Sequence, residues 1–70
     1  MSTIVLTDVR KHTGRELSAN EAKRCVGHAN ISMLKAQAAA LSLHPWHNTP
    51  TEWLRLEACL VLIEERRRAR

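Results

Sequence analysis

The sequence predicts an all-α fold: an antiparallel helical hairpin, with helices at about 19–43 and 50–69, and a short N-terminal segment packed on it. The first observation is that two prolines, Pro45 and Pro50, separate two long proline-free segments. The second is that apolar residues recur at steps of three and four in both segments. The third is composition: with no Phe or Tyr and two Trp, the core must come from Leu, Ile, Val, Met and Ala, which favour helices. Seventy residues make one small domain, residues 1–70.

The N-terminal segment, residues 1–17, has the least regular pattern. Thr3–Thr7 is typical of a short extended arm, and Asp8–His12 of one helical turn that Gly14 ends. The segment therefore either stays a flexible arm or packs on the hairpin as a third layer. We expect packing, because exposed apolar surface is unfavourable. The apolar residues that would make this contact are Ile4, Leu6, Val9 and Leu17.

The first hairpin helix is predicted to begin after Ser18, because Ser18 and Glu21 have the spacing of a capping box. One apolar stripe then runs through the whole helix, and a second covers a neighbouring face of its later half. Gly27 lies inside this helix, where glycine costs about 1 kcal/mol relative to alanine. We expect it to allow the close approach of a packed neighbour. The first stripe is Ala22, Val26, Ala29, Met33, Ala36, Ala40 and Leu43, and the second is Ile31, Leu34, Ala38 and Leu41.

The turn of the hairpin lies around Trp46. Pro45 cannot continue a helix, and Thr49 is placed to cap a new one, with Pro50 at its first position and Glu52 completing a capping box. Trp46 is expected to cover the end of the core, with contact to a partner as the alternative.

The positive charge is expected to gather at the open end of the hairpin. If the chain folds back at Trp46, the last helix ends beside the start of the first helix. This basic pole then holds nine Lys and Arg against five Asp and Glu, so it carries the whole net charge of +4. Such a surface attracts phosphates or acidic protein surfaces. Its basic residues are Arg10, Lys11, Arg15, Lys23, Arg24, Arg66, Arg67, Arg68 and Arg70.

A break at Gly27 gives an alternative arrangement, a helix-turn-helix. Glu21–Cys25 and Ile31–Ser42 would be its helices and Gly27–Asn30 its turn. Lys23 takes a position that such motifs give to a small residue, and the second helix is largely alanine. One straight helix is therefore preferred. In the alternative, the residues facing a groove of nucleic acid would be Asn30, Ser32, Lys35 and Gln37.

No metal site, cofactor or catalytic residue is predicted. Cys25 with His28, and His44 with His47, have the spacing of zinc ligands, but a continuous helix would separate Cys25 from His44 by about 28 Å. The chain has no glycine-rich phosphate loop, and its size leaves little room for a cleft. Cys25 and Cys59 are expected to be free, buried thiols.

No segment is apolar for long enough to cross a membrane or to form a signal-peptide core. The longest apolar run, Ala58–Ile63, is far shorter than the ~20 residues of a membrane span. We therefore expect a soluble protein of the cytoplasm.

The chain as a whole resembles the small, basic, helical bacteriophage-encoded regulators that bind host RNA polymerase. The segments that carry the resemblance are Thr3–Arg15 and Trp53–Ala58. The resemblance implies a protein of the host bacterial cytosol that attaches to an RNA polymerase subunit without chemistry. It would inhibit sigma-dependent initiation or promote antitermination.

The residues expected to bind the partner come from the charge argument, together with Trp46. Three alternatives stay open: a small basic DNA-binding protein, an inhibitor of another host machine, and a homodimer rather than a monomer. The predicted partner-binding residues are Arg10, Lys11, Arg15, Lys23, Arg24, Trp46, Arg66, Arg67 and Arg68.

Overall fold

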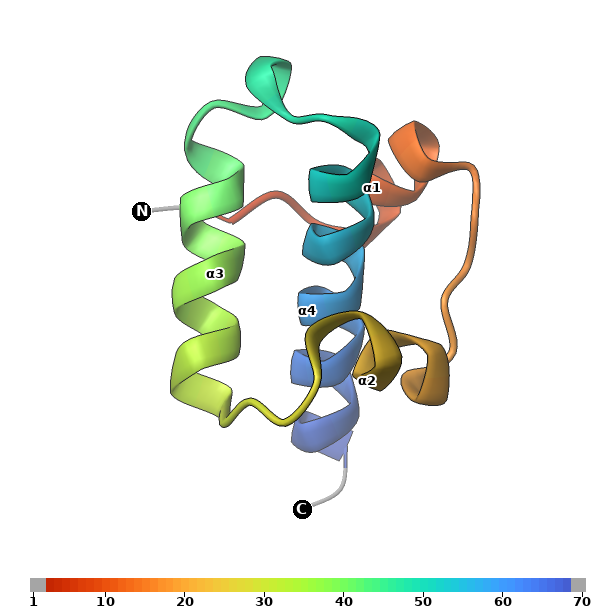
Figure 1. Cartoon of the computed structure of the whole chain (residues 1–70), viewed down its shortest axis with the longest axis vertical. Helices are drawn as coiled ribbons and strands as arrows, with labels where there is room; N and C mark the ends of the chain where they lie inside the picture. The colour runs from red at the N-terminus through yellow and green to blue at the C-terminus, as the bar shows by residue number, and fades with distance from the viewer. Residues whose placement is uncertain (1–2, 69–70) are drawn as a thin grey trace.

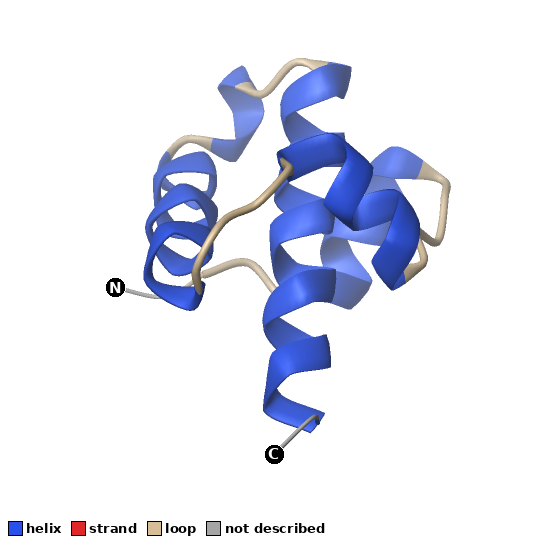
Figure 2. Ribbon diagram, turned by 60° about the horizontal axis from the view of Figure 1, so that its bottom comes forward, coloured by secondary structure: helices blue, strands red, loops and turns tan. Residues whose placement is uncertain are grey.

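The structure is a computed structural model that describes residues 3–68. Within that range the chain forms α-helices and one short 3-10 helix and no strand, which confirms the predicted all-α class (Figures 1 and 2). The end of the second predicted hairpin helix, residue 69, lies outside the described residues. In chain order the elements are α1 (Leu6–Thr13), α2 (Ala19–Val26), α3 (Ile31–Leu43), η1 (Pro45–His47) and α4 (Pro50–Arg68).

Helix α4 is the centre of the fold, and α1, α2 and α3 all pack on it (Figure 1). Four consecutive residues, Leu56–Cys59, are buried, as are Val61 and Leu62. Consecutive helical residues point in different directions, so they are all buried only if neighbours cover several sides. This explains why the apolar arc of α4 is wider than one partner helix could cover.

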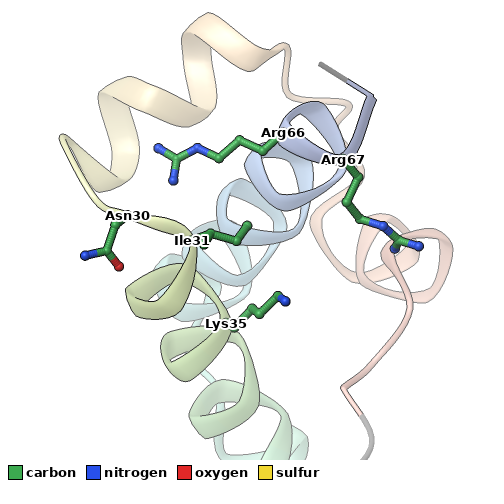
Figure 3. A pocket seen from close by; sticks show the side chains of 5 residues that line it. All are labelled: Asn30, Ile31, Lys35, Arg66 and Arg67. Carbon is green, nitrogen blue, oxygen red and sulfur yellow. The ribbon is translucent and has the colours of Figure 1, made fainter. Parts of the chain in front are cut away.

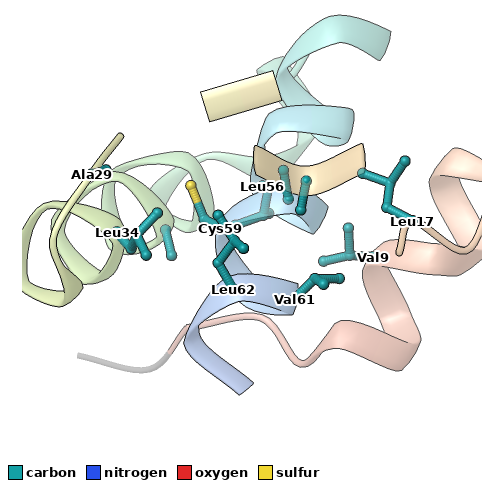
Figure 4. Close-up of a cluster of buried hydrophobic side chains, with 11 residues drawn as sticks. Val9, Leu17, Ala29, Leu34, Leu56, Cys59, Val61 and Leu62 are labelled. Carbon is teal, nitrogen blue, oxygen red and sulfur yellow. The ribbon is translucent and has the colours of Figure 1, made fainter. Parts of the chain in front are cut away.

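The N-terminal segment forms part of the core, as predicted (Figure 4). Val9 is completely buried, Leu17 is nearly so, and Ile4 and Leu6 pack against the same cluster. The backbone N–H of Ile4 also donates a hydrogen bond of 3.2 Å to Ser42 Oγ on α3. In its described part, residues 3–17, the segment therefore packs on the helices, and its flexibility stays a prediction.

The continuous helix predicted for residues 19–43 is wrong, because the chain breaks between α2 and α3. Gly27 has φ 68° and ψ −150°, a conformation that is essentially restricted to glycine. Asn30 then starts a new helix, since its side chain accepts a hydrogen bond from the N–H of Met33. The expected close approach at Gly27 is also wrong, because an added Cβ would meet no atom within 4 Å.

The break changes which stripe of α3 is buried. The second predicted stripe faces α4, with Leu34 and Ala38 buried. The first stripe is on the outside in α3, where Met33 and Leu43 are about half exposed. A stripe keeps one direction only along a single axis, so it cannot continue from α2 into α3.

The predicted caps and the reversal of the chain are confirmed. Ser18 and Glu21 form a complete capping box. Thr49 and Glu52 exchange the same two hydrogen bonds at the start of α4. The chain reverses through η1, so α3 and α4 run antiparallel (Figure 1). Asn48 fixes this reversal, because its Nδ2 donates a 2.9 Å hydrogen bond to the carbonyl oxygen of Leu41.

Candidate functional site

The predicted basic pole does not exist as one surface, because α1 lies beside the first half of α4 (Figure 1). The ring of His12 stacks on Trp53 with centroids 4.0 Å apart, and Arg10 contacts Glu57. Trp53 and Arg66 are about 20 Å apart along α4, at the α-helical rise of about 1.5 Å per residue. The hairpin prediction placed the N-terminal segment next to the end of α4. The break at Gly27 instead allows α2 to pack on that part of α4. Arg70, the last member of the predicted pole, lies outside the described residues.

Glu57 binds the chain around α1 to the core. Its side chain is completely buried and its carboxylate accepts three hydrogen bonds. The donors are Thr13 Oγ1 at 2.7 Å, the N–H of Leu17 at 2.8 Å and Arg10 Nε at 3.4 Å. A buried carboxylate is tolerated when it is paired and fully hydrogen-bonded. Glu57 was missed in the sequence, although an acidic residue between Leu56 and Ala58 in an apolar run is a signal for such a role.

The basic residues near α1 are largely balanced by acidic neighbours. Arg10 lies 3.4 Å from Glu57 and 3.7 Å from Glu16, and Lys11 lies 3.7 Å from Asp8. The first of these pairs is part of the fold, so Arg10 has a structural role. Lys11 and Arg15 are exposed around a shallow hollow beside Gly14.

A different set of basic residues gathers where the α2–α3 connector meets the end of α4. We call this set the cationic face. Its residues line two adjoining hollows, of about 680 and 430 Å³, that share Arg66. Among residues 3–68 no carboxylate side chain lines either hollow. The cationic face consists of Lys23, Arg24, His28, Lys35, Arg66 and Arg67, all of them exposed.

Arg66 holds the cationic face together. Its Nη2 donates a 2.6 Å hydrogen bond to the carbonyl oxygen of Ala29, which ties the end of α4 to the α2–α3 connector. Figure 3 shows Arg66 and Arg67 leaving α4 in different directions, with Lys35 rising from α3 between them. Arg67 lies 4.0 Å from Glu64, a long and exposed pair that leaves its charge largely available.

The predicted binding residues are thus divided. Lys23, Arg24, Arg66 and Arg67 come together, whereas Arg10, Lys11 and Arg15 lie apart from them. Arg68 is exposed in the last turn of α4 but lines neither hollow.

Two residues of the cationic face, His28 and Lys35, were absent from the predicted set. The helix-turn-helix alternative would have found Lys35, because it places Lys35 in the helix that follows the break.

Trp46 does not cover the core. It is 75% exposed in η1, with the ring of His44 5.4 Å away. It borders a hollow of about 420 Å³ together with His12 and Trp53. Trp53 is instead the partly buried tryptophan that packs on the core. The expectation of a capping role for Trp46 is wrong, and its predicted contact with a partner stays a prediction.

The cysteines differ in environment. Cys59 is buried and its Sγ lies 3.8 Å from Gln37 Oε1, while Cys25 is exposed. The prediction of two buried thiols is therefore wrong for Cys25, because the break places the end of α2 at the surface. Burial raises the pKa of the Cys59 thiol above its ordinary value.

Within residues 3–68 no three His, Cys, Asp or Glu side chains lie close enough together to hold a metal ion. None of the helices in this part of the chain is long and apolar enough to cross a membrane.

Comparisons with protein-family models, curated proteins and solved structures find no match to this chain.

Proposed function

We propose that the protein is a non-catalytic regulator of transcription that binds RNA polymerase in a bacterial host. The observation that supports this is the cationic face: five permanent positive charges lie on one exposed surface, and no carboxylate side chain of the described residues lines its hollows. Such a surface attracts an acidic partner over a distance and aligns it on approach. The choice of RNA polymerase comes from the resemblance to phage-encoded regulators.

Binding alone is sufficient for this role. A small protein that occupies part of the polymerase can impede promoter-directed initiation by the sigma-containing enzyme, or let elongating polymerase pass terminators. Trp46, the most exposed large apolar side chain of residues 3–68, lies in η1 where the chain reverses between α3 and α4, and it gives a second point of attachment. An exposed tryptophan is a frequent anchor in protein interfaces.

Capture of purified polymerase tests this proposal. Core enzyme and sigma holoenzyme, both treated with nuclease, are passed over the immobilised protein. We expect retention that weakens as salt is raised, because exposed charges are screened. If neither form of the polymerase is retained at low salt, the proposed function is wrong.

Transcription assays distinguish the two regulatory effects. Inhibition of initiation would lower the yield of abortive products from a promoter template, whereas antitermination would raise the fraction of transcripts that pass a terminator. Absence of both effects at saturating protein would contradict a regulatory role, even with capture observed.

A further inference from the structure

The contact that the cationic face makes can be identified more closely. We infer that the cationic face binds the phosphate backbone of double-stranded DNA. This inference rests on the proposed function and divides its contacts: the cationic face attaches to the DNA that the polymerase transcribes, and Trp46 in η1 is left to contact the polymerase itself.

The side chains of the cationic face suit phosphates better than a protein surface. Protein interfaces take most of their binding energy from buried aromatic and apolar anchors. The cationic face offers few of them: among residues 3–68 no tryptophan lines its hollows, its one ring is the polar imidazole of His28, and its apolar residues are Leu62, buried in the core, and the half-buried Ile31. It offers Lys and Arg side chains, which are the usual partners of phosphates, and the guanidinium fork matches phosphate oxygens in a bidentate way.

The second argument is the spread of the charges. A single small anion is best held by cations that converge on one point. Here the cations divide between two hollows that meet at Arg66, and Arg66 and Arg67 extend in different directions (Figure 3). The hydrogen bond from Arg66 to Ala29 fixes the residue that the two hollows share. Cations that are spread over a surface in this way are suited to successive phosphates of a polymer.

The third argument favours a duplex over a single strand. Proteins that bind single strands combine a basic groove with aromatic rings on which bases stack. Both tryptophans of this chain lie away from the cationic face, since Trp46 is in η1 and Trp53 stacks on His12 near the start of α4. Without a stacking surface, the exposed backbone of a duplex is the better match.

The contacts are expected to be independent of base sequence. In the helix-turn-helix alternative α3 would read base edges, but two of the four residues that it places in a groove have other partners. Asn30 caps the helix through Met33, and Gln37 faces Cys59. Exposed positions on α3 include Met33, whose side chain cannot donate to base edges. Phosphate contacts without base contacts position a protein on a duplex but do not specify a sequence.

A salt titration with matched variants tests the inference. Binding of a fluorescent 20-base-pair duplex is followed by anisotropy at about 25 to 200 mM salt. If all five permanent cations each neutralise one phosphate, the slope of log K against log salt is about −4.5. The cationic-face variant is Arg24→Gln/Lys35→Gln/Arg67→Gln. The control is Lys11→Gln/Arg15→Gln/Arg55→Gln, three exposed residues outside the face. Both variants lose three of the positive charges that give the net charge of +4, so both carry +1.

The two variants should behave differently although their net charge is the same. For the cationic-face variant, we expect the slope to fall in magnitude by about 2.7 and affinity at low salt to fall on the order of 100-fold. The control should change affinity by less than about threefold and keep its slope. Far-UV circular dichroism checks that both variants keep their helical content. An equal loss in both variants would overturn the inference, and so would the absence of duplex binding at low salt.

Competition identifies the group that is bound. Poly-glutamate supplies carboxylates, and a single-stranded thymidine 20-mer supplies phosphates without a duplex. We expect unlabelled duplex to displace the probe at the lowest concentration of charge. If poly-glutamate displaces it equally well, the face recognises negative charge in general, and the inference is wrong.

The outcome is separable from that of the proposed function. Polymerase captured after nuclease treatment, with no binding of the duplex, would overturn this inference and leave the proposed function standing. Loss of both would overturn both.

Discussion

The two ends of α4 use arginine in different ways. In its first half, the buried carboxylate of Glu57 pairs with Arg10 of α1, so the charge of this arginine is balanced within the fold. Near its end, Arg66 and Arg67 lie on an exposed surface, and no carboxylate side chain of the described residues lines its hollows. Arginines that are equivalent by composition therefore lie in different environments: one is paired with a buried acid, and the others are exposed, as the proposed attraction of a partner requires. The difference depends on whether a buried acid lies opposite, which composition does not reveal.

The largest expected effect comes from removing Glu57. In Glu57→Ala the N–H of Leu17 and the hydroxyl of Thr13 lose their acceptor, and Arg10 loses its partner. Breaking a buried charged pair costs about 3–5 kcal/mol, a large share of the stability of so small a domain. Urea denaturation followed by circular dichroism measures the loss. The control is Glu65→Ala, an exposed residue of the same helix, which should change the free energy of unfolding by less than about 0.5 kcal/mol. Equal urea midpoints for the two variants would show that Glu57 does not hold α1 and the residues after it on α4.

A smaller effect is expected at the break between α2 and α3. Gly27→Ala should lower the free energy of unfolding by about 1–3 kcal/mol, because alanine rarely adopts the conformation of Gly27. Gly14 is the matched control: with φ 66° and ψ 18° it lies in the ordinary left-handed region, where alanine costs about 1 kcal/mol. Neither added Cβ would meet a neighbouring atom, so backbone conformation alone is compared. If Gly27→Ala is the milder change, the connector does not depend on glycine.

The smallest effect concerns the two capping boxes. Hydrogen bonds from Ser18 and Thr49 lower the pKa of Glu21 and of Glu52 below the ordinary value of 4.5. A lowered pKa in the folded state means that stability is present above pH 4.5 and is lost as the pH falls below it. Glutamine caps without titrating, so Glu21→Gln/Glu52→Gln should lose less stability than the wild type between about pH 5 and 3. Identical pH profiles in urea denaturation would exclude this contribution.

Local signals in the sequence were sufficient for much of the fold. The caps at Ser18 and Thr49 and the reversal at Pro45 depend on short-range chemistry, and the structure has them where they were predicted. The apolar residues of the N-terminal segment also predicted its packing, because burial of Val9 and Leu17 against the helices removes their apolar surface from water.

The break at Gly27 was harder to predict. The cost of a helical glycine is only about 1 kcal/mol, and a regular apolar stripe on both sides of it outweighed that signal. The deciding feature was the combination of Gly27 with the N-cap Asn30, the first and last of the four residues between α2 and α3.

Only part of the candidate site was predicted, because the break at Gly27 was not. Charge counting found Lys23, Arg24, Arg66 and Arg67, which the structure brings together. Charge counting also included Arg10, Lys11 and Arg15, which lie apart from the cationic face. Their position could not be predicted without the break at Gly27, because the break allows α2 to pack on α4.

The central claim is that the cationic face, and not the surface around α1, is where the protein docks. Titration of ¹⁵N-labelled protein with a short DNA duplex, followed by amide chemical shifts, tests it residue by residue. We expect shifts at Lys23–Lys35 and at the end of α4 around Arg66, with the amides of Leu6–Thr13 unchanged. Shifts centred on Leu6–Arg15, or no shifts at any residue, would contradict the claim.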